Sequence, residues 1–196
     1  MYVNRFNRKR GFDYRRPGMY FVTINLHRHR RLFGKVVDGQ MQLNELGQIA
    51  ATCWQEIPQH FAHVRIDAWV IMPSHVHGIL EITPTDASPF SRTPTTRKII
   101  PAANAAGALG TIVGSYKAAV ARQINLSTHC PHKPLWHRSF HDWIIRDSQH
   151  LWNTRRYIRN NPKVWGHCNR TPSRSSHVRD IPRTYEACLA QRSPPP

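Results

Sequence analysis

The chain has 196 residues, enough for one domain with a hydrophobic core and too few for two ordinary domains. Its 28 Lys and Arg against 11 Asp and Glu give a formal net charge of +17, which predicts a polyanionic partner, with nucleic acid as the first candidate. Its cysteines form no CxxC pair, which argues against a zinc ribbon. It has neither an apolar stretch of ~20 residues nor an apolar signal core, which argues against a membrane partner and predicts a cytoplasmic protein.

The first half of the chain predicts two strands separated by a helix. Residues 20–26 alternate and are rich in β-formers, which is typical of a strand. Residues 43–61 carry apolar residues at helical intervals, with Asn44 as the cap and an end near Pro58. Residues 64–72 form a nearly unbroken apolar run, which predicts a central strand covered on both faces.

The second half predicts two further strands and two further helices. Residues 75–82 alternate and form the second strand of a hairpin with the preceding run. Helical spacing covers residues 109–126, and an aromatic, β-rich strand covers 135–146. The last helix is predicted over 148–161 and should end before Pro162, because the residue that precedes a proline is disfavoured in the helical conformation.

This order of elements predicts an α+β domain of ferredoxin-like type, an antiparallel sheet with helices packed on one face. We expect the domain to span residues 16–166, preceded by a basic arm at 1–15. Residues 83–106 are dense in Thr, Pro, Ser and Ala and predict a mobile loop. Residues 167–196 are polar, basic and proline-rich, which predicts a disordered tail.

A pair of histidines opens the strand predicted at residues 75–82. Residues two apart in a strand point the same way, so His75 and His77 could bind one divalent metal while Val76 enters the core. In a chain with 13 histidines such pairs also arise by chance, and packing is the alternative. His137 and His141 alternate in the same way on another strand, for which DNA contact or packing is favoured over a second metal site.

The segment WVIMPSHVHGI at residues 69–79 resembles the metal-binding strand of the HUH-class single-tyrosine transposases, particularly the REP-associated tyrosine transposases and their insertion-sequence relatives. The resemblance extends from about residue 16 to 165. It implies the HUH endonuclease fold, which is ferredoxin-like or RRM-like, and the nicking and joining of single-stranded DNA. The other matching segments are 20–24, 109–113, 135–142, 144–146 and 156–162.

The resemblance also implies a tyrosine nucleophile on the last helix, at Tyr157. Helical spacing turns Tyr157 well away from the apolar stripe of Leu151 and Ile158, and thus outward to a site. Asn161 follows four residues later on nearly the same side, where its carbonyl oxygen could complete a metal site with the two histidines. The alternative for Tyr157 is packing against the sheet, and Tyr116 is the rival nucleophile, although core packing is favoured for it.

The implied chemistry is attack by Tyr157 on a phosphodiester, which gives a 5′-phosphotyrosine and a free 3′-hydroxyl. A second 3′-hydroxyl can reverse the step and so transfer the strand. The resemblance implies Mg²⁺ or Mn²⁺, whereas imidazole ligands alone would suit zinc or nickel equally. The substrate is expected to be single-stranded or hairpin DNA, bound by a monomer or a homodimer.

Basic and aromatic side chains near the predicted nucleophile are candidates for DNA contact. Arg155, Arg156 and Arg159 could favour ionisation of the phenol or simply contact phosphates. The aromatic residues Trp136, Phe140 and Trp143 could either stack on unpaired bases or pack in the core. Further candidate DNA-binding residues are Arg138, Arg146 and Lys117.

Two other functions are compatible with this composition. One is a nucleic-acid-binding regulator that does no chemistry, and the other is a metal-dependent nuclease that uses water rather than tyrosine. A pure binding protein has no need for His75, His77, Tyr157 and Asn161 together. Their coincidence therefore favours the transposase hypothesis.

Overall fold

The computed structural model describes residues 12–14, 16–84, 109–128 and 134–168. The predicted N-terminal arm, loop 83–106 and C-terminal tail lie almost wholly outside this described part of the chain. Within it, no helix combines the length and the apolar character needed to cross a lipid bilayer.

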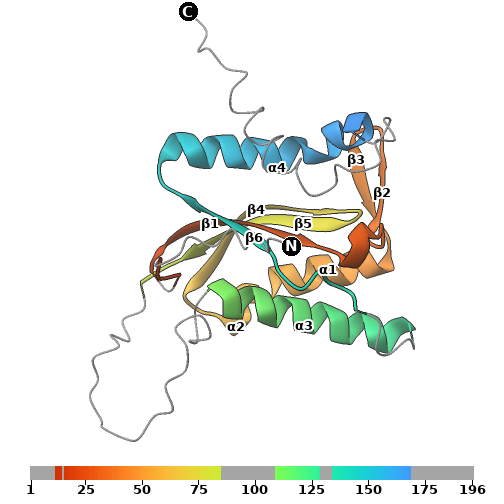
Figure 1. The fold of residues 1–196 in the computed structure, drawn as a ribbon, viewed down its shortest axis with the longest axis horizontal. Coiled ribbons are helices and arrows are strands. Elements are labelled where there is room, and N and C mark those ends of the chain that lie inside the picture. The colour runs from red at the N-terminus through yellow and green to blue at the C-terminus, as the bar shows by residue number, and fades with distance from the viewer. Residues whose placement is uncertain (1–11, 15, 85–108, 129–133, 169–196) are drawn as a thin grey trace, which may run out of the picture.

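An antiparallel sheet of four strands forms the centre of the molecule (Figure 1). The strands are β1 (Gly18–Asn25), β4 (Val64–Met72), β5 (His75–Ile82) and β6 (His141–Ile145), in the spatial order β4-β5-β1-β6. The predicted α+β class is therefore confirmed. The prediction that β4 is central is wrong, because β4 lies at one edge of the described sheet. An apolar run indicates that both faces of a strand are covered, but it does not indicate whether a neighbouring strand pairs with each edge.

The strand predicted over residues 135–146 is shorter in the structure. Only β6 pairs with β1 as a ladder, while the segment before it touches the sheet through one isolated bridge between Trp136 and Leu26. Aromatic content without regular alternation therefore predicted too long a strand.

Helices cover both faces of the sheet (Figure 1). On one face lie α1 (Glu45–Gln55), α2 (Ile57–His60) and α3 (Leu109–Thr128), and on the other lies α4 (Ser148–Cys168). The prediction of helices on one face only is wrong. The reason is that the sheet carries apolar side chains on both sides, so each side needs a cover.

Two cores of unequal size result from this arrangement. The smaller core lies between the sheet and α4 and contains Phe21, Ile79, Tyr157 and Ile158. The larger core lies between the sheet and the helices of the other face. Its buried strand and helix residues include Val22, Ile24, Val76, Leu80, Trp54, Ile112, Tyr116 and Val120. The alternation of β1 and β5 thus sends one set of side chains to each core.

A second, two-stranded sheet lies outside the predicted elements. It consists of β2 (Gly34–Val37) and β3 (Gln40–Leu43), joined by Asp38 and Gly39, whose φ angles are 50° and 71°. Asp-Gly between two short strands is a strong signal for a two-residue hairpin, because both turn residues need a positive φ. The signal was therefore present in the sequence.

The predicted first helix begins as expected and then breaks. The side chain of Asn44 accepts a hydrogen bond of 3.0 Å from the backbone N–H of Gly47, so the predicted N-cap is confirmed. The chain then leaves α1 after Gln55 and restarts as α2, with Pro58 in its first turn, where a proline is tolerated.

The last helix extends through Pro162 to Cys168, so the predicted end before Pro162 is wrong. Proline removes one hydrogen bond, the bond that the carbonyl of Ile158 would otherwise accept. The turn beyond it gains tertiary packing, because the ring of Trp165 lies 5.5 Å from that of His75. The local tendency of a helix to end before a proline is thus overridden by tertiary contacts, which cannot be seen in the sequence.

Gly78, next to His77, provides space for a buried tryptophan. A Cβ atom built at Gly78 would lie 2.1 Å from Cζ2 of Trp54, whose side chain is fully buried. We therefore expect Gly78→Ala to lower the free energy of unfolding by about 1–3 kcal/mol through overpacking. Urea denaturation followed by circular dichroism measures the change.

Gly114 in α3 supplies the matched control, because a Cβ atom there would meet nothing within 4 Å. Gly114→Ala should leave stability unchanged or raise it by up to about 1 kcal/mol, since alanine is the better helix former. Equal stability of the two variants would contradict the close packing of Trp54 on β5.

Candidate active site

The two histidines of β5 lie on the face of the sheet that α4 covers. In the ladder His77 is opposite Thr23 and His75 is opposite Asn25, while Val76 between them enters the larger core. The ring centroids of His75 and His77 are 4.5 Å apart. The strand periodicity thus brings both imidazoles to one place.

Hydrogen bonds and burial fix the state of these rings. Nδ1 of His77 lies 2.9 Å from the hydroxyl of Thr23, and Nδ1 of His75 lies 3.2 Å from the hydroxyl of Ser74. Burial, helped by the charge of His29, lowers the pKa of His75 to about 3. Burial, with a smaller contribution from His75, holds the pKa of His77 well below its usual value. Both rings are therefore neutral near pH 7, which is the form that binds metals.

Tyr157 of α4 contacts this pair from the face of the sheet that α4 covers. Its hydroxyl lies 3.4 Å from Nε2 of His77, and its ring packs edge-on against Phe21 at 5.9 Å between centroids. The side chain is 9% exposed. Tyr157 therefore contacts the site and packs against the sheet at the same time.

The expectation that Tyr157 turns away from the apolar stripe of α4 is wrong. Tyr157 and Ile158 belong to the same small core, and Leu151 packs against it. The buried face of α4 is wider than the stripe of Leu151 and Ile158, because the polar Thr154 is also fully buried. Tyr157 meets the histidines because that face is turned towards the sheet.

Asn161 lies one helical turn beyond Tyr157 and is 6% exposed, so it is on the buried side of α4. One turn further, Trp165 packs against His75, and the guanidinium of Arg31 lies 5.6 Å from the centroid of the Trp165 ring. Neither Trp165 nor Arg31 was predicted at the site, because no motif marks them and Arg31 joins the site only through the tertiary fold.

A divalent cation fits the donor set at this place. The described residues hold no group of three or more His, Cys, Asp and Glu side chains that could bind a metal, so a cation bound by His75 and His77 would take its third ligand from another residue type among them. His75 and His77 supply two neutral imidazoles whose Nδ1 atoms face hydroxyl groups, and Asn161 on α4 carries an amide oxygen. Imidazole and amide ligands together suit a cation of intermediate hardness.

Tyr116 lies in the larger core, on the opposite face of the sheet from His75 and His77. It is 2% exposed, and its hydroxyl donates a hydrogen bond of 3.2 Å to the carbonyl of Ala50. Burial raises its pKa well above the usual value, which opposes ionisation. The structure thus shows the core packing that was favoured for Tyr116.

The arginines near Tyr157 have different surroundings. Arg155 forms a bidentate pair with Asp67 on β4, with Nε 2.8 Å from Oδ1, and this pair lowers the pKa of Asp67. The guanidinium of Arg156 lies 5.4 Å from the centroid of the Trp152 ring. The candidate DNA-binding residues that are exposed are Arg138, Arg146 and Arg159.

Lys117 and Trp136 contribute to the structure of the loop before β6. The ammonium group of Lys117 donates to the carbonyls of His137 and Arg138, at 2.8 and 3.3 Å. The indole N–H of Trp136, which is buried in the larger core, donates to the carbonyl of Lys117 at 2.9 Å. Trp136 therefore has the core role that was its alternative, whereas Trp143 on β6 is 38% exposed.

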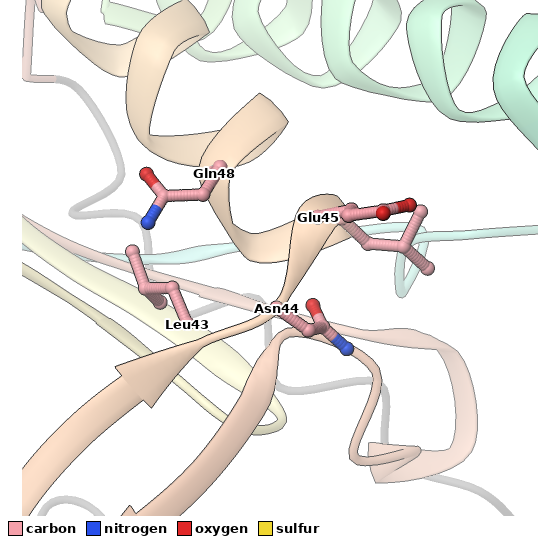
Figure 2. Close-up of a pocket in the computed structure, with 5 residues that line it drawn as sticks. Leu43, Asn44, Glu45 and Gln48 are labelled. Carbon is pink, nitrogen blue, oxygen red and sulfur yellow. The ribbon is translucent and has the colours of Figure 1, made fainter.

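A surface hollow lies apart from the histidines, where β3 meets α1 (Figure 2). Its only ionisable side chain is that of Glu45, and Asn44 is engaged as the helix cap. The hollow is therefore no rival to the histidine site. The residues that line it are Leu43, Asn44, Glu45, Leu46 and Gln48.

Comparisons with known proteins agree with this fold. No protein-family model matches the chain. The chain is 36% identical over 159 residues to an uncharacterized protein of Haemophilus influenzae, a match that spans 81% of this chain and 87% of that protein. A solved structure of a REP-associated tyrosine transposase bound to a REP hairpin is similar, with a TM-score of 0.50 at 21% identity over 90% of this chain and 86% of that one. This second likeness shows the fold.

Proposed function

This chain belongs to one family with the uncharacterized Haemophilus influenzae protein, and we propose that it is a transposase that nicks and rejoins single-stranded DNA through a single tyrosine. The observation that carries the proposal is the contact between Tyr157 on α4 and His77 on β5. The Oη atom of Tyr157 lies 3.4 Å from the Nε2 atom of His77. The shared fold with a hairpin-bound transposase supports it.

The proposed reaction exchanges one phosphate ester for another. The phenolic oxygen of Tyr157 attacks the scissile phosphorus and forms an O–P bond, while the bond from phosphorus to the 3′-oxygen breaks. The phenol gives up its proton, and the departing 3′-oxygen takes one up as a hydroxyl. Because the ester energy is retained, a second 3′-hydroxyl can attack the phosphotyrosine and restore a phosphodiester without ATP.

We also propose that His75, His77 and Asn161 bind Mg²⁺ or Mn²⁺. The cation would polarise a non-bridging oxygen of the phosphate and orient it for attack. The chain keeps both imidazoles neutral by burial, and Thr23 orients the ring of His77 by its hydrogen bond to Nδ1. Phe21 holds the ring of Tyr157 beside them.

A covalent adduct tests the proposed function directly. The full-length protein is incubated with single-stranded oligonucleotides that form hairpins, in the presence of Mg²⁺ or Mn²⁺, and run on a denaturing gel. A protein–DNA band that survives denaturation is expected. Free nicked product without any adduct would point to a nuclease that uses water, and binding without cleavage would point to a regulator.

Binding to single-stranded DNA should weaken steeply as salt rises. The net charge of +17 implies several phosphate contacts, and each contact on a single strand contributes about −0.7 to the slope of log affinity against log salt. Fluorescence anisotropy at several salt concentrations measures this slope. A slope near zero would contradict binding driven by phosphate contacts.

A further inference from the structure

Asn25 ends β1 directly opposite His75 in the ladder. Two residues earlier, Thr23 is opposite His77 and contacts its Nδ1 atom. Because side chains two apart in a strand lie on the same face, Asn25 points to the α4 side of the sheet, as Thr23 does. Cβ atoms of directly opposed residues in an antiparallel pair are about 4.5–5.5 Å apart. Asn25 and His75 are therefore directly opposed neighbours on the same face of the sheet.

The side-chain oxygen of Asn25 is buried without a partner. The residue is 4% exposed, and its Oδ1 atom accepts no hydrogen bond from any residue that the structure describes. The backbone carbonyl of Asn25 is satisfied by the N–H of His137 at 2.9 Å. A buried acceptor left unpaired costs about 1–3 kcal/mol, so a partner from outside the residues that the structure describes would stabilise this oxygen.

The chemistry of the place identifies that occupant. Nδ1 of His75 already faces the hydroxyl of Ser74, and the rings of His75 and His77 lie 4.5 Å apart between centroids. An amide oxygen next to this pair of imidazoles can be satisfied by a divalent cation that the imidazoles also bind. Carbonyl oxygens are preferred ligands of Mg²⁺ and Mn²⁺, whereas imidazoles alone suit zinc and nickel.

We propose that Asn25 supplies an oxygen ligand to the cation bound by His75 and His77, and that it thereby favours Mg²⁺ or Mn²⁺ over Zn²⁺. This inference rests on the metal site of the proposed function and adds a residue to it from β1. With Asn161 of α4, two amide oxygens would accompany two imidazole nitrogens.

The test is metal binding by the full-length protein without DNA, measured for Mn²⁺ by electron paramagnetic resonance and for Zn²⁺ by calorimetry. Asn25→Ala should weaken Mn²⁺ affinity about 10–100-fold and Zn²⁺ affinity much less. Asn25→Asp keeps an oxygen ligand and adds charge, so it should bind Mn²⁺ at least as tightly as the parent. Asn44→Ala is the matched control, because Asn44 caps α1 away from the histidines and should leave both affinities unchanged.

Several results would overturn the inference. If His75→Ala loses Mn²⁺ binding while Asn25→Ala retains the parent affinity, Asn25 is no ligand, and the metal site of the proposed function stands. Weaker Mn²⁺ binding by a folded Asn25→Asp would also contradict the inference, because an added carboxylate ligand should hold Mn²⁺ at least as tightly. This comparison remains decisive if the alanine variant does not fold. If the parent protein binds no Mn²⁺, the inference and the proposed metal site fail together.

Discussion

Tyr157→Phe should fold and bind hairpin DNA as the parent protein does, yet form no covalent adduct and lose more than about 10³-fold in cleavage. Phenylalanine keeps the ring that packs against Phe21 and removes only the hydroxyl, whose contact with His77 is long at 3.4 Å. A denaturing gel measures the adduct, and anisotropy measures binding. An adduct formed by Tyr157→Phe would contradict the assignment of the nucleophile.

Tyr116→Phe is the paired control for this experiment. It loses one hydrogen bond, to Ala50, at a cost of about 1 kcal/mol in stability, and should remain active because Tyr116 lies on the far side of the sheet. Peptide mapping of the trapped adduct should find the nucleotide on Tyr157. If both variants still cleave, the nucleophile is water and the protein is a metal-dependent nuclease.

Replacing either His75 or His77 with alanine should abolish cleavage while leaving most of the DNA affinity, because the proposed metal serves the reaction and phosphate contacts dominate binding. His77 is 1% exposed, so its loss leaves a cavity, and His77→Gln provides a variant of closer volume. Cleavage of a labelled hairpin oligonucleotide and anisotropy with the same DNA measure the two effects.

His60→Ala is the matched control, since His60 is an exposed residue of α2 on the opposite face of the sheet. It should cleave as the parent does. Circular dichroism shows whether each variant is folded. Full cleavage by both the His75 and the His77 variants would remove the metal from the proposed reaction.

The sequence located the histidine strand correctly because its signals are local. The bounds predicted for β4 and β5, residues 64–72 and 75–82, are those of the structure. Alternation with period two places His75 and His77 on one face, and the short turn between the two strands fixes the hairpin. The Asn44 cap was predictable for the same reason, since its partner lies within the first turn of the helix.

The errors arose where distant parts of the chain determine the outcome. Beyond Pro162, α4 continues and packs Trp165 against His75, a contact that no local pattern predicts. The inward orientation of Tyr157 depends on a second apolar face of the sheet, to which β1 contributes Phe21. Helical spacing identified which residues are neighbours on α4 but not which of its faces is covered.

The unequal size of the two cores has a consequence for local stability. The layer that carries Tyr157 is held by a small apolar cluster and by the Arg155–Asp67 pair, whereas α1 and α3 bury a much larger set of side chains. Segments with fewer buried apolar contacts open at a lower free energy than the whole molecule unfolds. Local opening of α4 would therefore uncover the histidines while β1 and β5 remain folded on the other helices, so Tyr157, the proposed nucleophile, belongs to the layer with the smaller core.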